Sequence, residues 1–171
     1  MRSVQLDLTI PCRQPDEVYA TLADFERYPA LAPAVRTVTV TATTERVSVS
    51  RWEVNFRRGV LRWVEEDTFD PEGRTIAFRQ LEGDIAVFEG CWSCRPAEGG
   101  TTVVFEARFD MGIPSLADAL EPIAARTLAD NTAAIVSGLF GGGSVVEQVA
   151  FDGVAQAQAQ PAAPAPAGAT P

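Results

Sequence analysis

Apolar side chains occupy every second position from Val4 to Ile10, with polar residues between them. This alternation predicts a strand with one buried face. Pro15 and the two acidic residues behind it then mark the start of a helix, and the segment from Tyr28 to Pro33 has room for at most one further helical turn. The pattern therefore predicts one strand followed by two short helices.

The pattern changes between Arg36 and Met111 to period-two runs of β-branched and aromatic residues. Turn-forming residues such as Arg57-Arg58-Gly59 and Asp70-Pro71-Glu72-Gly73 separate six such runs. Connections this short join antiparallel neighbours, and a twisted meander of this length curls around a core. With the first strand, the sequence predicts a curved antiparallel sheet of seven strands.

Helical periodicity begins at Pro114 and ends at the glycines from position 141 onward. Pro122 removes one backbone donor inside this segment, so we expect a kink or a break there. The predicted helix has a face of small side chains, which either packs closely on the sheet or leaves space above it: Ala124, Ala125, Ala129, Ala133 and Ala134. The fold class is therefore α+β, with a long C-terminal helix against the sheet.

The end of the chain differs in composition from the rest. Residues 144–154 fit either a short strand or a further helix. Residues 155–171 consist of Ala, Gln, Pro, Gly and Thr without charge or periodicity, which is typical of a disordered tail. We therefore expect one domain over residues 1–154 and a tail over 155–171.

Charge and composition exclude several classes of function. The 171 residues carry a net charge of −9 with a pI near 4.5, which disfavours nucleic acid and anionic membrane partners. No apolar run reaches the roughly 18 residues of a membrane span, and Asp7 interrupts the place of a signal peptide. We therefore expect a cytoplasmic protein without integral membrane association.

The chain contains no histidine, which removes Ser-His-Asp and Cys-His nucleophile systems. Cys91 and Cys94 have CxxC spacing, but a single such pair without histidine cannot complete a zinc site. We therefore expect no metal and no cofactor. Any chemistry falls to carboxylates, Arg, Tyr, Cys or water.

Strand parity predicts an inner face rich in aromatic side chains, and seven of them are candidate ligand-binding residues. In a packed protein such residues form the core, whereas in a hollow one they line a binding site: Trp52, Trp63, Phe78, Phe88, Trp92, Phe105 and Phe109. Asn131 lies in the middle of the long helix, where an amide is unfavourable unless it bonds another group. We take it as a candidate ligand contact, with an exposed helix position as the alternative.

The order of these elements, together with several local segments, resembles the START-like superfamily with its helix-grip fold. The segments that carry the resemblance are Trp52-Glu53-Val54, Leu61-Arg62-Trp63-Val64-Glu65, Phe88-Glu89-Gly90-Cys91-Trp92 and Phe109-Asp110-Met111. They are similar to the polyketide cyclase/dehydrase branch, which also holds coenzyme Q-binding and ribosome-association-toxin-like proteins. The resemblance spans about residues 1–142 and implies a cavity between the sheet and the long helix.

The resemblance implies that a polyketide, quinone or lipid binds in this cavity. In the aromatase/cyclases of the branch, the ligand is a poly-β-ketone on an acyl carrier protein, which undergoes aldol cyclisation and dehydration. The strand with Trp63 resembles the aromatase strand that carries a catalytic arginine, but Asp67 stands at that position here. Val35 stands near the place of a family tyrosine.

Glu65 and Asp67 share the strand face of Trp63 and are the candidate catalytic residues. In an apolar cavity, desolvation raises the pKa of a carboxyl group, which then transfers protons as aldol closure and dehydration require. The alternatives are solvated strand ends, ion pairs with Arg62 or Arg79, and a β-bulge that reverses the parity.

Three functions follow from these observations. The first is a binding protein for a hydrophobic small molecule that acts as a polyketide cyclase or aromatase, with an acyl carrier protein as its further partner. The second is a non-catalytic lipid or quinone carrier. The third is an interaction protein of the ribosome-association type, which the acidic charge disfavours because ribosomal RNA is anionic.

Overall fold

The computed structural model describes residues 1–156, and the chain forms a single sheet with helices on one face. The strands are β1 (Arg2–Pro11), β2 (Val35–Thr43), β3 (Val47–Phe56), β4 (Gly59–Asp70), β5 (Thr75–Gly83), β6 (Val87–Ala97), β7 (Gly100–Asp110), β8 (Val145–Phe151) and β9 (Val154–Gln156). The helices are α1 (Pro15–Ala23), α2 (Tyr28–Leu31) and α3 (Ala117–Leu139), with 3-10 turns η1 (Phe25–Arg27) and η2 (Pro114–Leu116).

The strands follow the order β2-β3-β4-β5-β6-β7-β1-β8-β9, and all neighbours are antiparallel. β2 to β7 form the predicted meander. The predicted number of seven strands is too low, because the segment after the long helix adds β8 and β9 beyond β1. This segment was predicted as either a strand or a helix, and its backbone forms a short hairpin.

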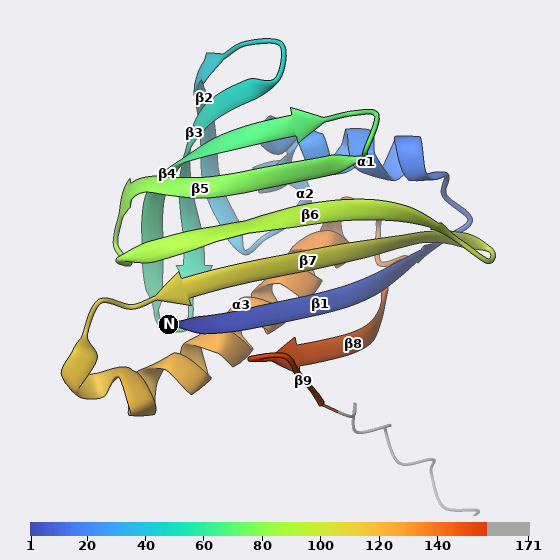
Figure 1. The fold of residues 1–171 in the computed structure, drawn as a ribbon. Coiled ribbons are helices and arrows are strands. Elements are labelled where there is room, and N and C mark those ends of the chain that lie inside the picture. The colour runs from blue at the N-terminus through green and yellow to red at the C-terminus, as the bar shows by residue number, and fades with distance from the viewer. Residues whose placement is uncertain (157–171) are drawn as a thin grey trace, which may run out of the picture.

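Figure 1 shows how the sheet bends around α3, so that β2 and β3 stand behind β5 to β7. The helix lies across the concave face and contacts β1, β3 and β8. α1 packs on β6 and β7, at the opposite end from the start of α3. This is the helix-grip arrangement, and it encloses the space between sheet and helix.

α3 is one continuous helix through Pro122, so the alternative of two helical pieces is wrong. Only the turn η2 before it is separate. Pro122 lies in the second turn of the helix, where the loss of one backbone hydrogen bond costs less than in the middle. The long helix therefore spans the concave face as one unit.

The C-terminal half of α3 approaches α2 very closely. A Cβ atom on Gly138 would lie 2.3 Å from the carbonyl oxygen of Leu31 and 3.1 Å from the Cα of Ala32. Only a residue without a side chain allows the two backbones to meet at this distance. Gly138 thus allows the backbones of α2 and the end of α3 to pack closely at one end of the fold.

The buried side chains confirm the predicted alternation on β1 and on the inner face of the meander. Leu6, Leu8 and Ile10 are fully buried, and they share the main core with residues of α1, α3 and the central strands. A smaller cluster joins Val4 and Phe109 to Ala124, Ala125 and Ala129 of α3. The small residues of the helix therefore pack closely on β1 and β7 at these positions.

The predicted domain boundary at residue 154 falls at the first residue of β9. The predicted tail lies outside the described residues from position 157 onward, so its disorder stays a prediction. No helix of the described part is long and apolar enough to cross a lipid bilayer.

Candidate functional site

A cavity lies between the concave face of the sheet and α3. Its volume is about 110 Å³, and the empty space in and around it, with the open solvent at its mouth, is about 950 Å³. The walls come from η1, α2, five central strands, the β5–β6 loop, Met111 after β7, and α3. Space of this kind between sheet and helix is where small hydrophobic ligands bind in proteins.

All ten candidate site residues line this cavity. They are Trp52, Trp63, Glu65, Asp67, Phe78, Phe88, Trp92, Phe105, Phe109 and Asn131. The structure thus brings together residues from β3, β4, β5, β6, β7 and α3. That any of them binds a ligand or transfers a proton stays a prediction.

The aromatic rings form a continuous wall. Trp52 and Trp63 stack with 5.8 Å between their ring centroids and planes only 2° apart. Trp63 meets Phe88 edge to face, and Phe88 in turn contacts Phe78. Contacts of this kind hold each ring in one orientation and leave their faces and edges as the surface of the cavity.

Two carboxyl groups interrupt this apolar wall. Glu65 is 5% and Asp67 1% exposed, so neither is solvated as a strand end would be. β3 and β4 pair without a register shift, and the irregularity next to Glu65 lies in the pairing of β4 with β5. The parity of β4 is therefore kept, and Trp63, Glu65 and Asp67 share its inner face.

The indole groups of the stacked tryptophans connect to these two carboxyls. Trp63 Nε1 donates a hydrogen bond of 2.6 Å to Glu65 Oε2. Trp52 Nε1 donates to Ser50 Oγ over 2.8 Å, and Ser50 Oγ donates to Asp67 Oδ2 over 3.0 Å. Each carboxyl thus accepts one hydrogen bond from a neighbouring side chain.

Burial changes the acidity of both groups. Desolvation raises the pKa of Glu65 well above its usual value, and the negative charge of Asp67 raises it further. Desolvation also raises the pKa of Asp67, to about 7, although the hydrogen bond from Ser50 and the neighbouring Glu65 work in the opposite direction. Both groups are therefore weaker acids than a free carboxyl group, and they titrate as a pair.

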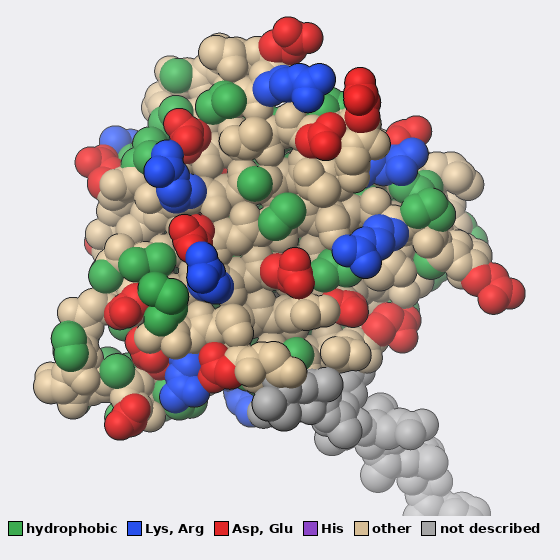
Figure 2. Space-filling model, in the orientation of Figure 1, with side chains coloured by type: hydrophobic (Ala, Val, Ile, Leu, Met, Phe, Trp, Pro, Cys, Tyr) green, Lys and Arg blue, Asp and Glu red, His purple; other side chains and the backbone are tan. Residues whose placement is uncertain are grey.

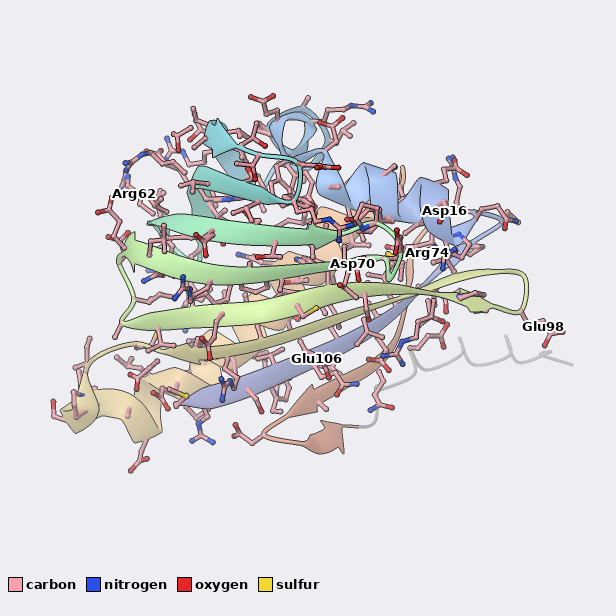
Figure 3. All side chains as sticks on the ribbon, turned by 45° about the horizontal axis from the view of Figure 1, so that its top comes forward. Asp16, Arg62, Asp70, Arg74, Glu98 and Glu106 are labelled. Carbon is pink, nitrogen blue, oxygen red and sulfur yellow. The ribbon has the colours of Figure 1, made fainter. Side chains whose placement is uncertain are left out.

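The arginines expected as alternative partners of these acids pair elsewhere. Arg62 binds Glu53, with 3.2 Å between Nε and Oε1, and its side chain extends outward at the edge of the sheet (Figure 3). Arg79 binds Glu66 on the outer face, with 3.0 Å between Nη2 and Oε1. No arginine of the described residues forms an ion pair with Glu65 or Asp67, so the cavity contains carboxyl groups without cations.

Asn131 is half-buried and already has a partner. Its Nδ2 donates to the carbonyl oxygen of Asn55 at the end of β3, over 2.7 Å. This contact ties α3 to the sheet beside the cavity mouth. The residue also lies on the cavity wall.

Sequence analysis missed several lining residues. Phe25 comes from η1 and Tyr28 from α2, and neither was among the predicted site residues. Tyr28 is buried, and its hydroxyl donates to the carbonyl oxygen of Leu22 over 2.7 Å. Thr132 lies next to Asn131 on α3 and is also buried. An aromatic residue directly before a Pro-rich turn is the signal that could have identified Tyr28.

Charged residues gather on the outside of the molecule, where acidic and basic side chains alternate over the face of the sheet (Figure 2).

Among the described residues, no group of three or more Cys, Asp or Glu side chains is placed to hold a metal ion. The titratable groups on the cavity wall that have a raised pKa are Tyr28 and the carboxyl pair.

Comparison with solved structures gives many similar folds. Protein TTHA0849 from Thermus thermophilus is 27% identical, with a TM-score of 0.75 over 82% of this chain and 95% of that protein. The Zhui aromatase/cyclase from Streptomyces sp. R1128 is 22% identical, with a TM-score of 0.71 over 82% of this chain and 93% of that one. A START superfamily protein from Mycobacterium smegmatis is 15% identical, with a TM-score of 0.70 over 84% and 97%.

No curated protein sequence matches the chain. The family described as polyketide cyclase/dehydrase and lipid transport matches residues 12–136, which is most of the described fold. The match includes the short helices, the whole meander and α3 up to Val136. The predicted resemblance to the START-like superfamily is confirmed, and the chain belongs to the polyketide cyclase/dehydrase and lipid transport family.

Proposed function

We propose that the protein binds a hydrophobic, ketone-bearing molecule of the polyketide class in this cavity, and that Glu65 and Asp67 catalyse its aldol cyclisation and dehydration. The observation that carries the proposal is a pair of buried carboxyl groups, both with a raised pKa, on the wall of an aromatic cavity. One group supplies an acid and the other a base at the same pH.

The first step forms a carbon–carbon bond. The Asp67 carboxylate takes a proton from the carbon between two carbonyl groups, and the resulting enolate carbon attacks a second carbonyl carbon of the same molecule. The electron pair of that carbonyl moves to its oxygen, which takes the proton of Glu65. The product is a β-hydroxy ketone, with Asp67 protonated and Glu65 ionised.

The second step removes water and restores the pair. The Glu65 carboxylate takes the remaining proton next to the ketone while the bond from carbon to the new hydroxyl breaks. Asp67 gives its proton to the departing hydroxyl, which leaves as water. Each carboxyl thus serves once as acid and once as base, and the cycle needs no oxidant or metal.

The aspartate at position 67 favours proton transfer by the Glu65–Asp67 pair. An arginine at the same position would stabilise a developing oxyanion by charge, whereas a protonated Glu65 does so by donating its proton. The aromatic wall holds a flat, growing ring system by its faces. The position of Asp67 therefore implies proton transfer by carboxyl groups in place of the aromatase arginine.

We also propose that an acyl carrier protein delivers the substrate. Arg57 and Arg58 are exposed in the β3–β4 turn directly after Phe56, which lines the cavity. Exposed apolar side chains lie just before α3 and in its first two turns: Ile113, Leu116, Leu120 and Ile123. Exposed cations beside an apolar surface suit an acidic carrier with a phosphate-linked arm.

The test uses a synthetic poly-β-keto thioester and follows ring closure by absorbance and mass spectrometry. We expect turnover by the natural sequence and a loss of about 10²- to 10⁴-fold in kcat for Glu65→Gln and for Asp67→Asn. The control is Glu82→Gln, which removes an exposed acid paired with Arg51 and should leave kcat unchanged.

Binding is measured separately by native mass spectrometry with the same compound. Retained binding with lost turnover in Glu65→Gln and Asp67→Asn supports catalysis by the pair. Binding without turnover in the natural sequence would instead support a lipid or quinone carrier. Unchanged turnover in both variants would refute the catalytic role. The double variant Arg57→Glu/Arg58→Glu tests delivery by a carrier protein. Slower turnover of the carrier-bound substrate, with unchanged turnover of the free thioester, supports delivery. Turnover rates equal to those of the natural sequence for both substrates refute it.

A further inference from the structure

We propose that Thr132 is a specificity-determining residue of the cavity, and that its hydroxyl donates a hydrogen bond to a carbonyl oxygen of the ligand on the α3 side. The inference deepens the proposed function by naming a group that recognises the ketone, and it rests on that function only for its effect on turnover. Recognition itself is a property of binding, so it is measured without any reaction.

The side chain of Thr132 is a buried polar group between apolar residues of the α3 wall. The residue is 4% exposed and lines the cavity. Leu128 and Ile135, one helical turn before it and one after it, line the cavity as well, so Thr132 lies in the middle of the face that α3 turns toward the ligand space. A valine has nearly the same shape and would fill this position without burying a hydroxyl.

The hydroxyl of Thr132 has no partner in the free protein. A threonine inside a helix commonly donates to the carbonyl oxygen four residues before it. Thr127 on the same helix does so, with 2.9 Å between its Oγ1 and the carbonyl oxygen of Ile123. Thr132 makes no such bond to Leu128, and no other group of the described residues pairs with its hydroxyl. A ligand atom that accepts this hydrogen bond therefore removes an unfavourable feature of the free protein.

The unpaired hydroxyl borders the cavity. Among the described residues, the fully enclosed side-chain atoms without a hydrogen-bond partner are Tyr19 Oη and Gln80 Oε1. Thr132 Oγ1 is not one of them, so it borders free space, and the free space that this residue lines is the cavity. The neighbouring Asn131 differs, because its Nδ2 already donates to the carbonyl oxygen of Asn55. Thr132 therefore offers a ligand a donor that no described group of the protein occupies.

Thr132 and the carboxyl pair lie on opposite walls of the cavity. Thr132 belongs to α3, which crosses the concave face of the sheet, whereas Glu65 and Asp67 belong to the inner face of β4 (Figure 1). Most of the wall between them is aromatic or aliphatic. A ligand whose carbonyl oxygen binds Thr132 therefore presents its opposite side to Glu65 and Asp67. The hydroxyl thus selects the orientation of the ligand as well as its chemical class.

The first test compares two probes of nearly the same shape, 1-tetralone and tetralin, which differ by one ketone oxygen. Isothermal titration calorimetry measures their dissociation constants with the natural sequence and with Thr132→Val. We expect the variant to bind 1-tetralone about 5- to 10-fold more weakly, which is the effect of one lost hydrogen bond, and to bind tetralin at least as tightly as the natural sequence does. The same change for both probes, or no binding of 1-tetralone to the natural sequence, would overturn the inference.

The stability of the free protein separates recognition from a purely structural role. Because Thr132→Val removes an unpaired buried hydroxyl, we expect the midpoint of urea unfolding to stay unchanged or to move to a higher urea concentration. A lower midpoint would show that the hydroxyl stabilises the fold, which contradicts the inference. Thr132→Ser keeps the hydroxyl and should bind 1-tetralone nearly as tightly as the natural sequence does. A loss of binding as large as that of Thr132→Val would also contradict it.

Thr127→Val is the matched control on the same helix. It removes a hydroxyl that donates to the carbonyl oxygen of Ile123 and does not line the cavity, so the binding of both probes should stay unchanged. A weaker binding of 1-tetralone equal to that of Thr132→Val would overturn the assignment to Thr132.

Turnover of the poly-β-keto thioester distinguishes this inference from the proposed function. We expect Thr132→Val to raise KM by about the same factor as the dissociation constant of 1-tetralone, with a smaller change in kcat. If the natural sequence shows no turnover, the proposed catalysis fails, and the dissociation constants of the two probes still decide the role of Thr132.

Discussion

Glu65 and Asp67 lie two positions apart on the inner face of β4, where both are almost fully buried and each accepts one hydrogen bond from a neighbouring side chain. Two buried acids with no cation partner among the described residues are an uncommon feature of a small domain, because each loses its hydration. This relationship has consequences for stability as well as for chemistry.

The stability of the fold should depend on the ionisation of Asp67. Its pKa is about 7 in the folded protein and near 3.8 when unfolded, so the folded state binds the proton more tightly between these values. Stability from this group is therefore greatest at acidic pH and falls as pH rises toward 7, by up to about 1.4 kcal/mol per pH unit.

Asp67→Asn should remove this dependence. We expect the free energy of unfolding of the variant, relative to the natural sequence, to increase from pH 4 to pH 7 and to level off above. Urea unfolding at four pH values measures it, with Glu82→Gln as the control. A constant difference over this range would show that the charge of Asp67 has no cost in the folded state.

Gly138→Ala should destabilise the protein by about 1–3 kcal/mol, although alanine favours helices over glycine. The added Cβ would lie 2.3 Å from the carbonyl oxygen of Leu31, and backbone atoms cannot move away without shifting α2. The matched control is Gly59→Ala, where the nearest atom is 3.8 Å away. Urea unfolding of the two variants compares them, and equal stabilities would contradict the close contact.

Asn131→Ala should lower the free energy of unfolding by about 1 kcal/mol, since it leaves the carbonyl oxygen of Asn55 without its donor. Asn131→Asp should cost more, because it places a carboxylate oxygen beside that carbonyl. The exposed neighbour Asp130 provides the control as Asp130→Ala. Thermal unfolding measures all three variants. An unchanged stability of Asn131→Ala would show that this hydrogen bond does not stabilise the fold.

The three cysteines should react with a maleimide at different rates. Cys12 is exposed, whereas burial raises the pKa of Cys91, and that of the buried Cys94 to about 12. At pH 7.5 we expect rapid labelling of Cys12, slow labelling of Cys91, and labelling of Cys94 only after unfolding. Peptide mass spectrometry assigns the sites, and Cys12→Ser should remove the rapid phase. Rapid labelling of Cys94 would show that the end of β6 opens.

Strand parity was enough to predict which residues face the cavity. β4 pairs with β3 in one register from Val47 to Phe56, so positions 63, 65 and 67 keep the same side. The irregularity toward β5 displaces Leu81 to the surface and leaves β4 unaffected. The period-two pattern therefore predicts which side chains of β4 point toward the site along the whole strand.

The parts that sequence could not supply depend on contacts far apart in the chain. β8 shows no clear alternation, and its pairing with β1 includes a register shift after Asp7. The strand forms because α3 returns the chain to the free edge of β1. In the same way, the hydrogen bond from Ser50 to Asp67 depends on side-chain orientation across two strands, which periodicity does not contain.

The aromatic wall has an optical consequence. The chain has three tryptophans, and Trp52, Trp63 and Trp92 all line the cavity. All of its indole fluorescence therefore originates in the walls of one chamber, and two of the emitters donate hydrogen bonds into the carboxyl network. The intrinsic emission spectrum of the unlabelled protein thus reports directly on ligand binding in the cavity and on the ionisation of the carboxyl groups beside it.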